Sequence, residues 1–182
     1  MRPLKEMIDQ FVFEGVLVPD NSCDFASPLV IVNKKDGGIR MAVDYREVNL
    51  QLESTANQLP YQPSLFQRLG GQQFFAKVDN LWGYHQLRLS EDSSKVTAIS
   101  TPWGVYRFLA CPFGISTAPG EYQARMAHEV LQDYYLNGAI VYIDDTVIYG
   151  RDVEGFLDIL DRVLSQMAKF NVRLQPSKCF LE

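Results

Sequence analysis

The stretch AIVYIDDTVIYG, residues 139–150, decides how the second half of the chain folds. Its aliphatic and aromatic side chains favour half-buried strands on both sides of two adjacent aspartates, Asp144 and Asp145. Aspartate is disfavoured within strands but common in tight turns, so we expect a β-hairpin whose two turn residues are Asp144 and Asp145. Adjacent carboxylates repel each other unless a cation neutralises them. The alternatives are a plain hairpin turn and a metal-binding hairpin, and a third carboxylate nearby would favour the second.

Two clear patterns predict the elements around this hairpin. Residues 153–170 place apolar side chains on one helical face after a suitable N-cap, Asp152, and predict a long helix. Residues 72–80 predict a short strand that ends at Asp79. Weaker patterns predict a helix over residues 3–14, a hairpin over 27–45, a polar connection over 49–63, a helix over 115–135 and a last strand within 172–181.

The order of these elements predicts an α+β fold. Across residues 73–181 strand, helix, hairpin, helix and strand follow one another, which favours an antiparallel sheet with helices on one face. On such a sheet the strand that ends at Asp79 can lie beside the hairpin that carries Asp144. Three carboxylates would then be neighbours, and their hard oxygen atoms suit Mg²⁺.

The composition is that of an ordinary globular protein. The chain has 182 residues, of which 47% are hydrophobic and 21% charged. The 3 widely spaced cysteines indicate reduced thiols, and with only 2 histidines no zinc spacing exists. No apolar run approaches membrane-spanning length, so we expect an intracellular protein without a membrane partner. The net charge of −5 disfavours nucleic-acid binding, although two divalent cations would more than neutralise three carboxylates.

Five short motifs follow one another in an order that is more specific than any of them alone. In this order the chain resembles the reverse transcriptases of gypsy-class long-terminal-repeat retrotransposons, over nearly its whole length. The motifs are VDYREVN (43–49), KVDNLWGYHQL (77–87), CPFGISTAPGEYQ (111–123), YIDD (142–145) and PSKC (176–179).

The resemblance implies the fingers and palm of a right-hand polymerase. Residues 1–70 would form the fingers with their connection to the palm, and residues 71–182 the palm, an antiparallel sheet with a ferredoxin-like core. Part of residues 85–115 is also assignable to the fingers. The family order implies that the sequence stops before the primer grip and the thumb.

The same resemblance implies a DNA polymerase that copies RNA or DNA templates. Asp79, Asp144 and Asp145 would be the catalytic carboxylates and, with Asn80, would bind two Mg²⁺ ions, with Mn²⁺ as an alternative. Two such ions promote attack of a primer 3′-hydroxyl on a deoxynucleoside triphosphate. The implied partners are a template with its primer, the nucleotide, and the remainder of a Pol polyprotein or a second subunit.

Three further residues match positions that bind the nucleotide in the family. Lys34 and Arg40 flank the turn of the predicted 27–45 hairpin and would contact the triphosphate. Tyr84 would lie under the sugar and exclude a 2′-hydroxyl. The alternatives are a solvated basic hairpin tip for the first two residues and a core tyrosine for the third.

Four residues of the CPFGISTAPGEYQ region and the helix after it also carry implied roles. Phe113 and Gly114 would line the nucleotide pocket, although a phenylalanine that packs a bend is the plainer interpretation. Gln123 and Arg125 would approach the template from the following helix, although polar residues on a helix surface usually face water.

Two other functions remain open at the level of sequence. A domesticated or decayed retroelement module could act as a non-catalytic binding or scaffold protein. Another palm-type nucleotidyl transferase is the second alternative, which Tyr84 disfavours because ribonucleotides need room for a 2′-hydroxyl. A retroelement enzyme implies a virus-like particle in the cytoplasm, or the nucleus.

Overall fold

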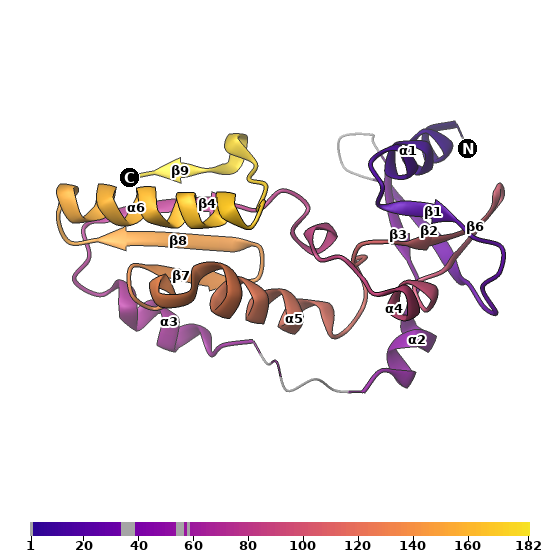
Figure 1. Cartoon of the computed structure of the whole chain (residues 1–182), viewed down its shortest axis with the longest axis horizontal. Coiled ribbons are helices and arrows are strands. Elements are labelled where there is room, and N and C mark those ends of the chain that lie inside the picture. The colour runs from indigo at the N-terminus through magenta and orange to yellow at the C-terminus, as the bar shows by residue number, and fades with distance from the viewer. Residues whose placement is uncertain (1, 34–38, 54–56, 58) are drawn as a thin grey trace. The chain divides into compact units, whose positions relative to one another are not determined.

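The computed structural model describes residues 2–33, 39–53, 57 and 59–182, and the chain forms two compact units (Figure 1). The first unit comprises Met1–Ser54 and Tyr84–Ala118, and the second comprises Thr55–Gly83 and Pro119–Glu182. The chain therefore passes from the first unit to the second, back to the first, and again to the second.

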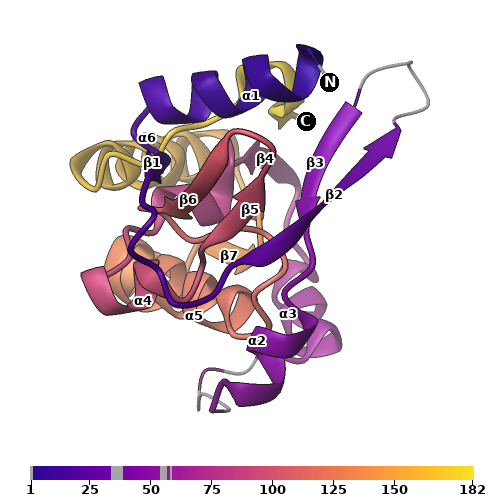
Figure 2. The same ribbon diagram turned by 90° about the vertical axis from the view of Figure 1, so that its right-hand side faces the viewer.

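The first unit is built on a five-stranded sheet with the strand order β1-β6-β5-β2-β3 (Figure 2). All neighbouring strands are antiparallel except the parallel pair β2 and β5. Its strands are β1 (Leu17–Pro19), β2 (Ser27–Asn33), β3 (Ile39–Val43), β5 (Ile99–Thr101) and β6 (Gly104–Phe108). Its helices are α1 (Arg2–Phe13), α2 (Arg46–Gln51), α4 (Glu91–Lys95) and the 3-10 turn η1 (Gly83–Gln86). The first residue of η1, Gly83, still belongs to the second unit.

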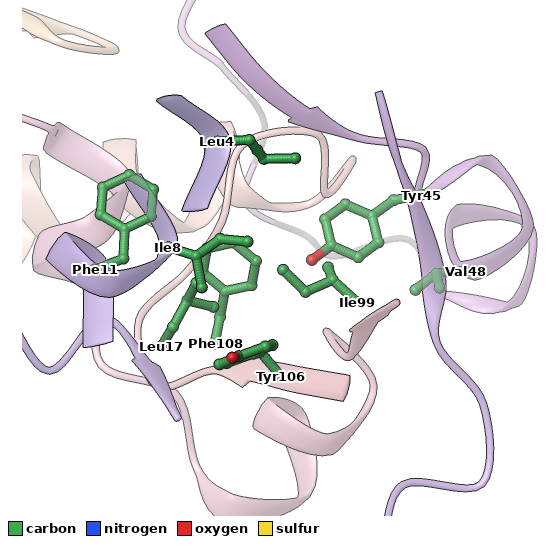
Figure 3. Packing of buried hydrophobic residues seen from close by; sticks show 9 residues of the cluster. All are labelled: Leu4, Ile8, Phe11, Leu17, Tyr45, Val48, Ile99, Tyr106 and Phe108. Atoms are coloured by element: carbon green, nitrogen blue, oxygen red, sulfur yellow. The ribbon is translucent and has the colours of Figure 1, made fainter. Parts of the chain in front are cut away.

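Helix α1 supplies one side of the core of the first unit (Figure 3). Leu4, Ile8 and Phe11 lie on one helical face and are buried. The hydroxyl of buried Tyr45 donates a hydrogen bond of 2.9 Å to the Thr97 carbonyl, which gives this polar atom a partner in an apolar environment. The other members of the cluster are Leu17, Val48, Ile99, Tyr106 and Phe108.

The second unit is built on a four-stranded antiparallel sheet with the order β7-β8-β4-β9. In Figure 1, β8 runs through the middle of this sheet with α6 beside it. The strands are β4 (Phe74–Asp79), β7 (Ala139–Tyr142), β8 (Asp145–Gly150) and β9 (Phe180–Leu181), and the helices are α3 (Gln62–Leu69), α5 (Ala118–Ala124), the π-helix η2 (Arg125–Leu131), α6 (Val153–Lys169) and the 3-10 turns η3 (Gln132–Tyr134) and η4 (Pro176–Lys178).

The two faces of this second sheet differ in burial. Ala76 and Val78 of β4 are buried beside residues of β7 and β8, and α6 and η2 contact these strands. Lys77 and Asp79 alternate with them and point to the opposite face. Helix α3 covers part of that opposite face, where Leu65 packs with Ile140 and Tyr149. The α+β architecture expected from the sequence is confirmed.

The helix predicted over residues 115–135 changes its hydrogen-bond pattern along its length. It begins as α5, widens into η2 and ends in η3. The Gln132 amide donates to the Ala127 carbonyl five residues earlier, which is the spacing of a π-helix. This wider turn buries four side chains of one segment at once, those of Met126, Ala127, Val130 and Leu131.

The two units do not follow the expected division of the chain into residues 1–70 and 71–182. Residues 55–70 group with the second unit because α3 packs on its sheet. Residues 84–118 group with the first unit because β5 and β6 pair with β1 and β2 there. The three cysteines are free thiols, as expected, and within the described residues no helix is both long and apolar enough to cross a membrane.

Candidate active site

The hairpin predicted over residues 139–150 is confirmed, but its turn lies one residue earlier than expected. Tyr142 pairs with Asp145, so the two turn residues are Ile143 and Asp144. Asp145 is not a turn residue because β8 begins there, with Tyr142 on one side and Asp79 on the other. The prediction that Asp144 and Asp145 form the turn is therefore wrong by one position.

The first turn residue has an unusual backbone conformation. Ile143 has a φ of 55°, which a β-branched residue rarely adopts and which glycine usually supplies in two-residue hairpins. The surrounding structure must hold this conformation in place.

The side chain of Gln123 in α5 provides that support. Its Nε2 donates to the Val141 carbonyl at 2.9 Å, and its Oε1 accepts from the Ile143 amide at 2.9 Å. Gln123 is only 3% exposed. The side chain is therefore buried and both ends of its amide bind the hairpin, while its contact with the template stays a prediction.

Asp79 and Asp145 lie directly opposite each other on β4 and β8. Opposed residues of an antiparallel pair point to the same face, and like charges in these positions repel. Two lysines balance them in this structure. Lys77 Nζ lies 3.0 Å from Asp145 Oδ1, and Lys178 Nζ lies 3.7 Å from Asp79 Oδ1.

Sequence reasoning missed both lysines, although each had a signal. Lys77 stands two residues before Asp79 on the same strand, and this spacing places both side chains on one face. Lys178 belongs to the PSKC motif at residues 176–179. The contacts themselves depend on strand pairing and could not be predicted from spacing alone.

Asp144 has one carboxylate oxygen that is withdrawn from solvent. Its Oδ1 is buried and has no hydrogen-bond partner among the described residues. Burial raises the pKa of Asp144, the negative charges of Asp79 and Asp145 raise it further, and Lys178 opposes this effect. The ionised form of Asp144 is therefore less favourable here than in water, and a nearby positive charge would stabilise it.

Gly83 leaves the space that Asp144 occupies. A Cβ atom at residue 83 would lie 2.5 Å from Asp144 Oδ1 and 3.1 Å from Cζ of Tyr122. No larger residue fits without moving the carboxylate or the buried ring. The glycine of the KVDNLWGYHQL motif thus has a direct steric reason at this site.

Asn80 adds a buried amide next to the carboxylates. Its backbone amide donates to the Asp144 carbonyl at 3.2 Å, and its side chain is 3% exposed. Neither amide atom has a hydrogen-bond partner among the described residues, and the buried Thr146 hydroxyl of β8 has none either. The role of Asn80 as a metal ligand stays a prediction.

The donor atoms at this hairpin are chemically suited to Mg²⁺ or Mn²⁺. Three carboxylates and an amide oxygen are hard oxygen ligands. In the part of the chain that the structure describes, no three acidic, histidine or cysteine side chains are yet grouped as metal ligands. Asp79 and Asp145 each contact an ammonium group in this structure.

Three of the predicted nucleotide-binding residues meet in the first unit. The Tyr84 and Phe113 rings have centroids 5.0 Å apart, and the Arg40 guanidinium lies 5.7 Å from the Phe113 centroid. A guanidinium over an aromatic face is held by a cation–π interaction. Lys34 lies outside the described residues.

Gly114, the last of the five predicted nucleotide-binding residues, shapes the backbone beside Phe113. It has a φ of 102°, which favours glycine, and its carbonyl accepts from Asn49 Nδ2 at 2.8 Å. Asn49 Oδ1 in turn accepts from the Ser116 amide at 2.9 Å. The VDYREVN and CPFGISTAPGEYQ motifs are thus joined through one asparagine side chain.

His85 links the Phe113 ring to the core of the first unit. Its ring centroid lies 5.4 Å from that of Phe113 and 5.5 Å from that of Phe11. Burial lowers the pKa of His85 to about 4, so the ring is neutral at pH 7. Apart from the position of His85 next to Tyr84, no sequence pattern indicated this role.

Arg125, the second predicted template contact, is partly exposed on η2. Its Nε lies 3.9 Å from Glu129 Oε2, one helical turn away. Surface pairs of this kind contribute little to stability and leave the guanidinium accessible. Its contact with nucleic acid stays a prediction.

Comparison with known proteins places this site in a family. Residues 32–182 match the model of the reverse transcriptase (RNA-dependent DNA polymerase) family. The chain is 30% identical over 182 residues to the retrovirus-related Pol polyprotein from transposon 412 of Drosophila melanogaster, covering 97% of this chain and 15% of the polyprotein. The chain belongs to the reverse transcriptase family, and its expected resemblance to retrotransposon enzymes is confirmed.

Solved structures show the same fold. Prototype foamy virus protease-reverse transcriptase matches with a TM-score of 0.88 and 25% identity, over 97% of this chain and 23% of the viral chain. The foamy viral protease-reverse transcriptase in complex with an RNA/DNA hybrid also gives a TM-score of 0.88, with 24% identity over 98% of this chain and 24% of the viral chain. The chain thus spans under a quarter of the length of each of these three relatives.

Proposed function

We propose that this chain is the fingers and palm part of a reverse transcriptase that extends a primer on RNA or DNA by two-metal nucleotidyl transfer. One observation carries the proposal: β4 pairs with β8 so that Asp79 lies opposite Asp145, next to Asp144 in the turn. Family membership supplies the reaction class. In this assignment the first unit is the fingers and the second unit is the palm.

Each carboxylate has a distinct part in the proposed reaction. Asp79 and Asp144 bind the divalent cations and Asp145 completes the group, with Asn80 as a further oxygen ligand. Two Mg²⁺ or Mn²⁺ ions would activate the primer 3′-hydroxyl and stabilise the leaving pyrophosphate. The raised pKa of Asp144 supports the proposal, because such a carboxylate gains most from a nearby cation.

The aromatic pair of the first unit orients the incoming nucleotide in this proposal. Tyr84 packs against the sugar and selects deoxynucleotides, while Phe113 and Gly114 line the pocket. Arg40, held over the Phe113 ring, contacts the triphosphate together with Lys34. The 5.0 Å contact between Tyr84 and Phe113 supports a shared role for these two rings.

The proposed partners are a template with its primer and a deoxynucleoside triphosphate. The foamy viral enzyme has been solved with an RNA/DNA hybrid, which supports the choice of nucleic acid. Arg125 is the proposed template contact. The remainder of a Pol polyprotein or a second subunit would complete the grip on the duplex, inside a cytoplasmic virus-like particle or the nucleus.

A non-catalytic binding or scaffold function is the second candidate. The two lysine–carboxylate pairs favour it, because they satisfy Asp79 and Asp145 without any cation. The two candidates differ in one observable property, which is whether the three carboxylates are needed for chemistry.

Primer extension tests the choice between them. The chain would be assayed with Mg²⁺ and with Mn²⁺ on RNA and DNA templates, beside Asp144→Asn and the matched control Asp158→Asn, whose carboxylate pairs with Arg162 on the surface of α6. We expect extension by the wild type and the control and none by Asp144→Asn. Equal extension by all three, or none by the wild type with either metal, would contradict the polymerase proposal for this chain.

A further inference from the structure

Lys77 extends from β4, the strand that also carries Asp79, and lies next to the group of three carboxylates formed by Asp79, Asp144 and Asp145. Its Nζ is 3.0 Å from Asp145 Oδ1, and the two side chains are 43% and 47% exposed. Lys77 pairs with Val147, two residues after Asp145 on β8, so the contact runs diagonally across the β4–β8 pair on one face. Strand pairing therefore fixes the position of this ammonium group beside the proposed metal ligands.

Lys178 reaches the group from a different element. It ends η4, and its Nζ lies 3.7 Å from Asp79 Oδ1. This lysine is more exposed than Lys77, at 59%, and its contact is longer. The two lysines thus contact Asp145 and Asp79, whereas Asp144 Oδ1 has no hydrogen-bond partner among the described residues.

The charges of this group nearly cancel without a metal. Three carboxylates and two ammonium groups leave a formal charge of −1, whereas three carboxylates alone would carry −3. A divalent cation attracted to Asp145 must compete with Lys77 for the same oxygen. Once displaced, the ammonium remains on the same strand and repels the cation that replaced it.

We propose that Lys77 is an internal counter-ion that sets how tightly this site takes a divalent cation, with Lys178 in a weaker second role. This inference rests on the proposed metal-binding function. Lys77 occupies Asp145 while no cation is bound and lowers the affinity for a cation alone. When a triphosphate is present, the same positive charge is favourable, so the cation and the nucleotide bind better together than separately.

The size of the effect follows from the charge removed. A unit positive charge several ångströms from a divalent ion at a solvent-exposed site changes its affinity by roughly three- to tenfold at low salt, and less at high salt. Lys77→Met should therefore bind Mn²⁺ more tightly by that factor. Lys178→Met should show a smaller gain because its contact is longer and more exposed.

The test is Mn²⁺ binding to the full chain, followed by the electron paramagnetic resonance signal of free Mn²⁺ without nucleotide. The variants are Lys77→Met, Lys77→Arg, which keeps the charge, and Lys169→Met, a matched loss of charge at the exposed end of α6. Asp144→Asn gives the background. Of these variants only Lys77→Met should bind Mn²⁺ more tightly, with Lys77→Arg and Lys169→Met near the wild type, and the difference should shrink with added salt.

The outcomes separate this inference from the function on which it rests. If the wild type and Lys77→Met both bind no more Mn²⁺ than Asp144→Asn, the proposed metal site itself is wrong. If the wild type binds above that background and Lys77→Met binds equally or more weakly, only the counter-ion role is overturned. Lys77→Arg keeps the test valid if the methionine variant fails to fold, because arginine should then preserve both folding and wild-type affinity.

Discussion

Two of the antiparallel hairpins, β7–β8 and β2–β3, differ in how firmly they are held. In β7–β8, Val141, Thr146 and Ile148 have no exposed surface, and Gln123 binds the turn. In β2–β3, the successive residues Val30, Ile31 and Val32 are 44%, 49% and 46% exposed. Because successive side chains point to opposite faces, neither face of this part of β2 is fully covered.

This difference teaches that the two hairpins meet different chemical demands. Carboxylates that bind metal must be fixed to within a fraction of an ångström, and buried strands with a bound turn provide this precision. In the proposed function the β2–β3 hairpin carries Arg40 toward a flexible triphosphate, and this contact has no such requirement. We therefore expect the two hairpins to open with different free energies, the first high and the second low.

The largest expected loss of stability comes from filling the space that Gly83 leaves for Asp144. Gly83→Ala would place a Cβ 2.5 Å from Asp144 Oδ1 and close to the buried Tyr122 ring. We expect a loss of about 3 kcal/mol in the free energy of unfolding, since the added methyl group displaces the Asp144 carboxylate and crowds the buried Tyr122 ring. Urea denaturation measures the loss.

Gly155→Ala in α6 is the control for that substitution. Its added Cβ would come no closer than 3.3 Å to any atom, at the Asp152 carboxylate. We expect a change of less than about 1 kcal/mol, because alanine favours a helix over glycine. Equal losses in both variants would show that the contact at Asp144 has no special importance.

The first unit should lose stability in mild acid. The pKa of His85 falls to about 4 in the folded chain, from its ordinary 6.5, because of burial. Between these values the unfolded state binds more protons, so stability is complete above pH 6.5 and declines as the pH falls toward 4. The loss should reach at most about 3 kcal/mol.

Thermal unfolding of the wild type and of His85→Phe between pH 7 and 4 measures this effect. Phenylalanine keeps a ring between Phe11 and Phe113 but cannot take a proton. We expect a flatter pH dependence in the variant. The same slope in both proteins would show that other groups cause the acid sensitivity.

Removing the support of the β7–β8 turn should have the next largest effect. Gln123→Ala leaves the Ile143 amide and the Val141 carbonyl without their partners and opens a small cavity. We expect a loss of about 2 kcal/mol in the free energy of unfolding. Hydrogen exchange at Ile143 should accelerate while exchange in β6 stays unchanged, and uniform acceleration would contradict a local role.

Neutralising the buried turn carboxylate should stabilise the metal-free chain. The pKa of Asp144 is raised, first by burial, so the folded state holds its proton to a higher pH than the unfolded state. Stability therefore falls as the pH rises from 3.8 through the folded pKa, and Asp144→Asn removes this penalty at pH 7. We expect the free energy of unfolding to rise by roughly 1 kcal/mol without metal, because the neutral amide has no charge to bury.

The metal dependence of the same variant provides the check. Mn²⁺ should raise the melting temperature of the wild type and leave that of Asp144→Asn unchanged, because the ion stabilises only the fold that binds it. A wild type that is more stable than Asp144→Asn without metal would contradict the proposed cost of burying the Asp144 charge.

The smallest effect is expected in the β2–β3 hairpin. Ile31→Thr exchanges a side chain that is 49% exposed for a smaller β-branched one. We expect a change within about 0.5 kcal/mol, as for most surface substitutions. A loss as large as that of Gln123→Ala would remove the contrast between the two hairpins.

The sequence predicted the elements that depend on local patterns. Helix α1, both hairpins, strand β4 up to Asp79 and helix α6 all follow from apolar periodicity, which reports burial directly. It also predicted that Asp79 would lie beside the Asp144 hairpin, because a sheet with these elements has few alternative topologies.

The features that the sequence did not predict depend on contacts between distant segments. Gln123 resembled a solvent-facing helix residue until its two bonds to the hairpin appeared. The turn moved by one residue because the pairing of Asp145 with Asp79 extends β8. The counter-ion role of Lys77 and the interleaving of the two units likewise arise only from tertiary packing.

Anomalous diffraction from crystals of the chain grown with Mn²⁺ and a non-hydrolysable deoxynucleoside triphosphate would test the central claim most directly. The account predicts manganese bound to the carboxylates of Asp79 and Asp144, with Asp145 released from the 3.0 Å contact to Lys77. Ordered crystals with no manganese at this hairpin, and with both lysine pairs unchanged, would contradict it.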